Sequence, residues 1–229
     1  DLAGEPMVVR VVRRARLART VDEVYVATED EEIAEVVSAA GIEVIRTQVE
    51  HASGTDRVAE AARILCLGAG DLIVNVQGDE PFLDPAVVDG IVQALEGGAE
   101  VATAAAPIEG QAEDHSVVKV VCDAQDRALY FSRSLVPLAG PWRQHIGIYG
   151  FSADALQRFT QLQPGALEQS ERLEQLRFLE NGIDIQVTNV SGAELSVDTP
   201  EDLARARTIW NRTVQACSPP LPIESPLTD

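Results

Sequence analysis

Two aspartates follow apolar segments at positions suited to metal binding. Asp79 comes after the apolar run 72–76, and Asp198 precedes a predicted helix that starts at Pro200. In open α/β sheets, ligands bind beyond the carboxyl ends of the strands. Two carboxylates that converge there can hold Mg²⁺ and leave coordination positions for phosphate oxygens and water. On spacing alone, a strand end at Asp79 and a helix cap at Asp198 explain the same residues.

A polar loop leads into the helix predicted over 55–67. It contains Ser53, Gly54 and Arg57 within the sequence His-Ala-Ser-Gly-Thr-Asp-Arg. The free N–H groups at the start of a helix favour anions and hydrogen-bond acceptors, so this loop could bind part of a ligand. An ordinary helix cap by Ser53 or Thr55 is the alternative.

Further polar side chains stand near predicted strand ends and on one predicted helix. Arg133 follows a strand, and Arg143 and His145 lie just before another. Arginine is suited to bidentate binding of a carboxylate, but each arginine alone is also typical of a surface charge. His145 could equally be a buried histidine bonded to the backbone. Glu174 and Gln175 flank an apolar helix face and could form its solvated edge.

The composition limits the classes of partner. The net charge of −19 opposes binding to DNA or RNA, whose backbones are negatively charged. No apolar run approaches the roughly 18 residues that a membrane span needs. The three cysteines match neither a zinc pattern nor a disulfide framework, which favours a reducing cytoplasm. The P-loop, serine-hydrolase and HExxH motifs are absent from this sequence.

Alternating strands and helices are predicted to position these residues. The first half has strands at 23–28, 42–46, 72–76 and 101–106, and helices at 6–18, 30–40, 55–67 and 85–96. This alternation predicts βαβ units, and therefore an α/β fold with a mostly parallel sheet.

The second half follows a different pattern. Its predicted strands are 117–122, 128–132, 146–151 and 185–190, and its predicted helices are 153–162, 168–181 and 200–210. No helix separates the first two of these strands, so they should form a hairpin or a sheet extension. The domain is expected to span 1–212, and the proline-rich segment 213–229 is expected to be a disordered tail.

Five sequence blocks, in order along the chain, resemble the family of 3-deoxy-manno-octulosonate (Kdo) cytidylyltransferases, or CMP-Kdo synthetases. The blocks are VNVQGDEP, VVKVVCDAQDRALYFSR, RQHIGIYGF, LEQLRFLENG and VDTPEDL, and the resemblance covers residues 2–212. The family is similar to sialic-acid cytidylyltransferases, but HIGIYGF and LEQLR favour the Kdo branch.

The resemblance implies a three-layer, Rossmann-like fold of the nucleotide-diphospho-sugar transferase type. It has a mixed, mostly parallel sheet and a small dimerisation extension. The implied protein is a cytoplasmic homodimer that uses Mg²⁺ to transfer CMP from CTP to Kdo, releasing pyrophosphate. Its product would supply activated sugar for lipopolysaccharide biosynthesis.

Site residues follow from the resemblance by motif match. Asp79 and Asp198 would be the Mg²⁺ ligands and, together with Arg133, the catalytic residues. The other positions that match sugar-acid contacts are Gln77, His145, Tyr149, Glu174 and Gln175, and those that match the cytidine-side loop are Ser53, Gly54 and Arg57.

The sequence departs from the family pattern in two places. The family normally begins with a strand and a glycine-containing loop, carrying Arg and Lys, that cradles the triphosphate, and this sequence starts after that segment. Lys119, the only lysine, lies in a predicted strand and cannot replace the loop lysine. The segment 136–142 is also shorter than in many relatives. Either the sequence is part of a longer chain, which the intact motifs favour, or it is a shortened protein with weak or no catalysis.

Three alternative functions stay open at this point. The first is a cytidylyltransferase for another acidic sugar, such as a sialic acid or an amino-Kdo. The second is a non-catalytic dimer subunit that binds a sugar or a nucleotide. The third is a sugar-1-phosphate nucleotidyltransferase, which would give no reason for the HIGIYGF and LEQLR blocks.

Overall fold

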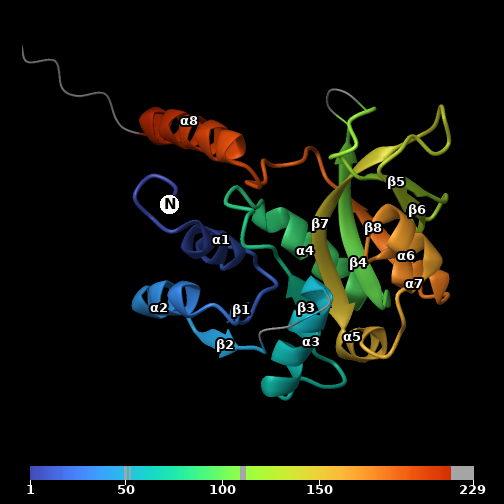
Figure 1. Cartoon of the computed structure of the whole chain (residues 1–229), viewed down its shortest axis with the longest axis horizontal. Helices are drawn as coiled ribbons and strands as arrows, with labels where there is room; N and C mark the ends of the chain where they lie inside the picture. Colours follow the sequence, from blue (N-terminus) through green and yellow to red (C-terminus); the bar gives the residue numbers. More distant parts are fainter. Residues whose placement is uncertain (49–50, 52, 109–111, 218–229) are drawn as a thin grey trace, which may run out of the picture.

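A mixed β-sheet forms the centre of the molecule (Figure 1). The computed structural model describes residues 1–48, 51, 53–108 and 112–217. Within these residues the sheet has six strands in the order β6-β5-β7-β4-β8, and β3 pairs with β7 beside this path. The strands are β3 (Leu72–Asn75), β4 (Val101–Pro107), β5 (Lys119–Cys122), β6 (Ala128–Ser132), β7 (Arg143–Ser152) and β8 (Ile185–Asn189).

The strand directions confirm a mixed sheet. β3, β4, β5 and β8 run in one direction, whereas β6 and β7 run in the other. Among the described strand pairs of this sheet, only β4 and β8 are parallel neighbours. The strand β7 is antiparallel to each of its neighbours, β3, β4 and β5. β5 and β6 form the expected antiparallel hairpin.

A separate two-stranded sheet stands beside the central one. It consists of β1 (Val26–Thr28) and β2 (Val44–Arg46), which are parallel. In the described part of the chain, β1 pairs as a strand only with β2, and β3 pairs only with β7. The two sheets are therefore not joined, and the expectation that a strand is missing from this sequence stays a prediction.

Helices cover both faces of the central sheet, as a three-layer fold requires. The helices of the first half are α1 (Met7–Ala15), α2 (Glu31–Ala39), α3 (Gly54–Ile64) and α4 (Pro85–Glu96), and those of the second half are α5 (Ala153–Phe159), α6 (Ala166–Glu171), α7 (Leu176–Glu180) and α8 (Pro200–Cys217). α4 packs on one face through Ile91 and Leu95. The helix can approach β7 closely because Gly150 on that strand has no side chain. A Cβ at Gly150 would lie only 2.4 Å from Ile91 Cγ2. The other face is covered by α3, α5 and α7, around an aromatic cluster that contains Phe151 and Phe178.

The prediction of a single helix over 168–181 is wrong. The chain forms two short helices there, α6 and α7. Arg172 ends α6 in the left-handed conformation, with φ of 56°, and this conformation cannot continue an α-helix. The break places Glu174 and Gln175 between the two helices, so they are not on a continuous solvated helix edge.

The last helix joins the two ends of the described chain. Figure 1 shows α8 beside α1 and the N-terminus. Leu2 is completely buried against Val197 and Ala206, and the Arg10 guanidinium lies 4.0 Å from the Trp210 ring centroid. α8 continues to Cys217 and so includes the first five positions of the segment expected to be a tail, whereas 218–229 lie outside the described residues. No helix of the described chain is long and apolar enough to cross a membrane.

Asp89 on α4 should be a main stabilising residue of this arrangement. Its Oδ1 accepts hydrogen bonds from the backbone N–H groups of Arg19 (2.8 Å) and Thr20 (3.0 Å) and from the Thr20 hydroxyl. Burial raises the pKa of Asp89, but these hydrogen bonds outweigh it and leave the pKa below its usual value. Its contribution is therefore present above the ordinary carboxyl pKa and is lost as the pH falls through the lowered value.

We expect Asp89→Ala to lower the free energy of unfolding by about 1–3 kcal/mol, because two partly buried N–H groups and the Thr20 hydroxyl lose their acceptor. Urea unfolding at pH 7 measures this loss, and the difference from the parent protein should shrink towards acidic pH. The exposed Asp22→Ala is the matched control and should stay within about 0.5 kcal/mol. An unchanged unfolding midpoint for Asp89→Ala would contradict this role.

Candidate active site

Asp79 and Asp198 come together at one edge of the central sheet. The backbone N–H of Val197 donates to the Asp79 carbonyl oxygen at 2.9 Å, which joins the loop after β3 to the segment before α8. The pKa of Asp79 is raised mainly by burial and further by the neighbouring Asp198 carboxylate. Asp198 is not the helix cap, because Thr199 Oγ1 accepts the Asp202 N–H at 3.1 Å. The predicted convergence of the two carboxylates is confirmed.

This pair lies in a wider acidic cluster. The pKa of Glu80 is raised to about 7, mainly by burial and then by the negative charges of Asp79, Asp198 and Glu194. None of these four carboxylates forms an ion pair with a described Lys, Arg or His. Asp79 Oδ1 is buried and has no hydrogen-bond partner among the described atoms.

The donor set fits a divalent cation. Carboxylate oxygens are the ligands that Mg²⁺ prefers, and a cation would relieve both the repulsion and the unpartnered Oδ1 of Asp79. No three His, Cys, Asp or Glu side chains of the described residues converge into a metal cluster. Such a cation would therefore have the two aspartates as its protein ligands and would keep its remaining positions for other oxygens.

A group of polar side chains lies next to this cluster, on the sheet face covered by α3 and α7. Asn75 on β3 and Thr103 on β4 both stand opposite Tyr149 on β7. The His145 ring packs 5.3 Å from the Tyr149 ring, centroid to centroid. Burial, together with the charge of Glu174, raises the pKa of Tyr149. Three strands and the break between α6 and α7 therefore supply one polar surface.

The buried polar atoms without partners all belong to this region. Among the described residues they are Asn75 Nδ2, Asp79 Oδ1, Glu174 Oε2 and Gln175 Nε2. A buried donor or acceptor without a partner costs about 1–3 kcal/mol, so such atoms in a native fold call for a partner outside the protein, such as water, an ion or a ligand. Two donors and two acceptors suit a molecule rich in hydroxyl groups.

The loop before α3 reaches the same edge of the sheet. A Cβ at Gly54 would lie 3.6 Å from Gln77 Nε2, so the start of α3 lies beside the loop after β3. Ser53 caps α3 by accepting the Asp56 N–H at 3.2 Å, as the alternative interpretation predicted. Arg57 pairs with Glu29 and donates to Thr47 Oγ1 at 3.2 Å. Gln77, Ser53 and Gly54 are thus brought together, whereas Arg57 is directed to the two-stranded sheet.

Arg133 is held by the β5–β6 extension and by the end of α6. Its backbone N–H donates to Glu171 Oε2 at 3.0 Å, and its guanidinium donates to the carbonyl oxygens of Glu171 (3.3 Å) and His115 (3.2 Å). Lys119 Nζ donates to the Arg133 carbonyl oxygen at 2.9 Å and is almost fully buried. Within the described residues the Arg133 guanidinium has no carboxylate partner, so its charge can serve an anionic ligand. Arg143 differs, because Asp126 pairs with it at 2.8 Å.

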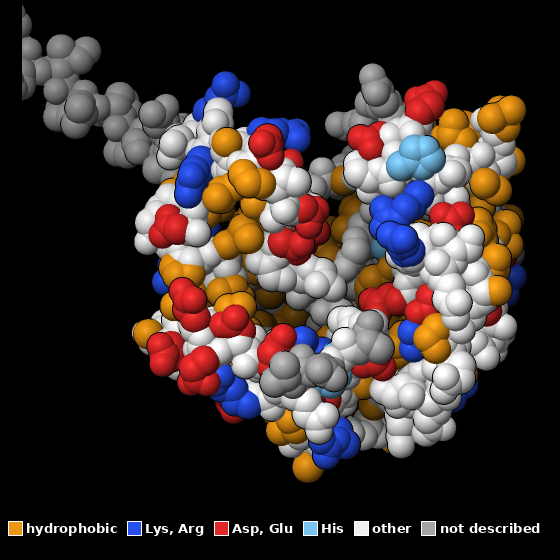
Figure 2. All heavy atoms as spheres, in the orientation of Figure 1, with side chains coloured by type: hydrophobic (Ala, Val, Ile, Leu, Met, Phe, Trp, Pro, Cys, Tyr) orange, Lys and Arg blue, Asp and Glu red, His pale blue; other side chains and the backbone are white. Residues whose placement is uncertain are grey.

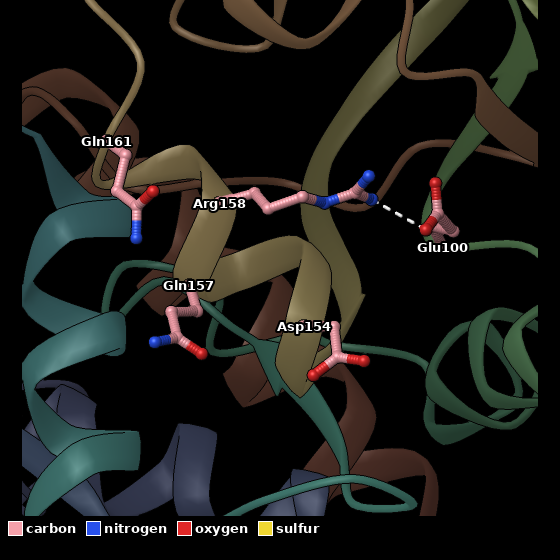
Figure 3. A pocket seen from close by; sticks show the side chains of 5 residues that line it. All are labelled: Glu100, Asp154, Gln157, Arg158 and Gln161. Carbon is pink, nitrogen blue, oxygen red and sulfur yellow. Dashed lines mark hydrogen bonds and ion pairs between the residues drawn. The ribbon is translucent and has the colours of Figure 1, made fainter.

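Figure 2 shows the face of the molecule hollowed between the N-terminal elements and the sheet extension, with acidic side chains along the hollow. A different concavity of ≈ 440 Å³ is lined by Glu100, Asp154, Gln157, Arg158 and Gln161 (Figure 3). There Arg158 pairs with Glu100 at 2.6 Å, and none of the predicted site residues takes part.

Sequence reasoning missed four residues of this region, namely Asn75, Glu80, Thr103 and Glu194. Asn75 interrupts a nearly continuous apolar strand, and that interruption was the available signal. Glu80 directly follows Asp79, but its raised pKa depends on residues 194 and 198, which only the fold brings near.

Comparison with known proteins identifies the family. A family profile described as "Cytidylyltransferase" matches residues 1–185. A 3-deoxy-manno-octulosonate cytidylyltransferase of Anaeromyxobacter dehalogenans is 50% identical over 216 residues, covering 91% of this chain and 88% of the relative. This chain belongs to the 3-deoxy-manno-octulosonate cytidylyltransferase family. A homologue of Methylococcus capsulatus with the same name is 46% identical over 226 residues, covering 90% and 88%.

Solved structures agree with this assignment. A structure entitled CMP:2-keto-3-deoxy-manno-octonic acid synthetase complexed with CTP superposes with a TM-score of 0.87 at 37% identity, covering 93% of this chain and 90% of that one. A 4-diphosphocytidyl-2C-methyl-D-erythritol synthase of Anaerococcus prevotii superposes with a TM-score of 0.62 at 11% identity, covering 93% and 92%, and shows the shared fold. The α/β nucleotidyltransferase fold implied by the sequence is confirmed.

We expect Asp198→Asn to lower kcat/KM by at least about 100-fold, because the acidic pair loses half of its charge. Calorimetric titration with Mn²⁺, used as a substitute for Mg²⁺, should show weaker cation binding by the same variant. Glu201→Gln, an exposed change on the neighbouring helix turn, is the matched control. Normal turnover with an unaltered metal requirement in Asp198→Asn would remove the metal role from this residue.

Proposed function

We propose that this chain transfers CMP from CTP to Kdo and releases pyrophosphate. The observation that supports this most directly is the set of buried, unpartnered polar atoms beside two converging aspartates. A sugar acid with many hydroxyl groups suits the unpartnered polar atoms, and a triphosphate with its metal ion suits the two aspartates. Relatives up to 50% identical carry the name of this activity, and a similar structure was solved with CTP.

The reaction needs an oxygen nucleophile and an anionic leaving group. The anomeric 2-hydroxyl of Kdo attacks the α-phosphorus of CTP and releases its proton to water, a new C–O–P linkage forms, and the P–O bond to the β-phosphate breaks. Pyrophosphate carries away the bonding electron pair. We assign no protein nucleophile, so catalysis consists of positioning the reactants and stabilising developing charge.

The side chains divide between the two substrates. Arg133 binds the sugar carboxylate, because its guanidinium is charged and has no described carboxylate partner. The sugar hydroxyls are held by Gln77, His145, Tyr149, Glu174 and Gln175. Ser53, Gly54 and Arg57 lie on the cytidine side, where the turn into α3 offers backbone N–H groups.

Asp79 and Asp198 would hold Mg²⁺. When bound, the ion would supply charge neutralisation at the phosphates and make the attacking hydroxyl more acidic. The aspartates also bring the loop after β3 and the segment before α8 to one place, which sets the position of both substrates. The chain works in the cytoplasm, and its product serves lipopolysaccharide biosynthesis, as the Kdo assignment implies.

We expect the chain to release pyrophosphate when it is supplied with CTP, Mg²⁺ and Kdo, as measured in a coupled phosphate assay. A sialic acid and an amino-Kdo, tested in parallel at the same concentration, should give much lower rates. Preference for one of these sugars would assign another acidic-sugar specificity. CTP binding without pyrophosphate release from a folded chain would support the non-catalytic alternative.

We also propose that two copies of the chain associate through the sheet extension. Leu129 on β6 and Leu138 in the following loop are 62% and 83% exposed, and Val136 between them is 46% exposed. Large apolar side chains that cluster on a surface usually mark an interface.

Light scattering should therefore give twice the mass of the 24.6 kDa chain at micromolar concentration. The double change Leu129→Glu with Leu138→Glu should shift the protein towards the monomer. Leu17→Glu is the control, because Leu17 is equally exposed at 62% but lies after α1. A monomeric parent protein would contradict the dimer.

A further inference from the structure

β7 carries a bulge next to the proposed sugar site. Thr103 on β4 stands opposite Tyr149, whereas the next residue, Ala104, stands opposite Ile146. Gly147 and Ile148 are therefore inserted between two consecutive ladder positions. Such an insertion leaves backbone groups without their ladder partners and redirects side chains nearby.

The buried Thr103 hydroxyl occupies this bulge. Its Oγ1 lies 2.8 Å from the Ile148 carbonyl oxygen and 3.2 Å from the Ile146 carbonyl oxygen. It also lies 3.0 Å from His145 Nε2. One hydroxyl thus connects the two carbonyls of the bulge to the histidine that precedes it.

Counting protons decides the direction of these hydrogen bonds. A threonine hydroxyl has one proton to donate, and carbonyl oxygens can only accept. If the proton pointed at His145, two oxygens would face the hydroxyl oxygen at 2.8 and 3.2 Å with no hydrogen between them. The hydroxyl therefore donates to the bulge carbonyls, and its oxygen accepts a hydrogen bond from the N–H group at His145 Nε2.

The surroundings keep the imidazole neutral. Phe131 packs edge-on against the His145 ring at 5.0 Å between centroids, and Tyr149 lies on another side. Burial lowers the pKa of His145 to about 3. A neutral imidazole with its proton on Nε2 has an unprotonated Nδ1 that can only accept a hydrogen bond.

Nδ1 is available to a ligand. It forms no hydrogen bond with the described residues, and it is not among their fully buried unpartnered atoms. His145 keeps part of its surface accessible. The nitrogen opposite the Thr103 contact can therefore receive a hydroxyl proton from outside the protein.

We propose that Thr103 is a positioning residue that fixes His145 as the neutral Nε2–H tautomer, so that Nδ1 accepts a hydrogen bond from a sugar hydroxyl. The second half of this inference rests on the proposed function. The first half concerns the histidine alone and holds whatever the substrate is.

The tautomer can be measured without any substrate. Long-range ¹H–¹⁵N correlation spectra of the full chain, labelled at histidine, distinguish Nε2–H from Nδ1–H, and His145→Gln identifies the signal among the three histidines. We expect Nε2–H in the parent protein and in Thr103→Ser, and a mixture of tautomers in Thr103→Val. An Nδ1–H or a charged His145 in the parent protein would overturn the proposal, even if Thr103→Val does not fold.

Kinetics then test the link to the sugar. Thr103→Val should raise the KM for Kdo about tenfold, with a smaller change in kcat and an unchanged KM for CTP, and Thr103→Ser should restore the parent value. Thr188→Val removes another partly buried threonine hydroxyl, which donates to the Gly90 carbonyl oxygen at 3.3 Å, and should change neither readout.

The possible failures can be told apart. An unchanged KM for Kdo in Thr103→Val would overturn the positioning role. Absence of Kdo turnover in the parent protein, with the Nε2–H tautomer present, would overturn the proposed function and the sugar contact but not the tautomer assignment.

Discussion

Repulsion between neighbouring carboxylates is the constraint around which this molecule is organised. Two unit charges about 4 Å apart interact by about 4 kcal/mol at an effective dielectric constant of about 20. The fold nevertheless half-buries Asp79 beside the exposed Asp198 carboxylate, with Glu80 and Glu194 nearby. Such an arrangement lowers stability unless a cation binds there. Under the proposed function, a bound Mg²⁺ would offset this cost.

The rest of the fold supplies what this acidic edge needs. β7 runs through the centre of the sheet and presents His145 and Tyr149 from one strand. The break between α6 and α7 turns Glu174 and Gln175 towards the same face. Arg133 brings a positive charge from the sheet extension. Opposite charges thus enter from separate elements, which is the arrangement that the proposed reaction between an anionic sugar and CTP requires.

Satisfied and unsatisfied polar groups are distributed unevenly. Lys119 is almost fully buried, but its Nζ donates to two carbonyl oxygens and so stabilises the loops around Arg133. Asp89 likewise has its acceptor oxygens occupied. By contrast, Asn75 and Glu174 each keep a buried atom without a partner. Among the described residues, the buried side-chain atoms that lack a hydrogen-bond partner are therefore concentrated where a ligand can reach them.

The order of strands and helices could be inferred from the sequence, because alternation and apolar periodicity depend on neighbouring residues. The helix 85–96 and the strand 128–132 are found at their predicted bounds. The motifs around Asp79, His145 and Asp198 were also sufficient to indicate the family and the chemistry. The break at Arg172 was not predictable, since the apolar spacing of 168–181 is equally compatible with one continuous helix.

Long-range contacts produced the remaining features. The acidic cluster joins residues more than a hundred positions apart, and the bulge beside Thr103 depends on the register between β4 and β7. A local pattern carries no information about such pairings, because burial and charge at a residue depend on whichever distant segment packs against it.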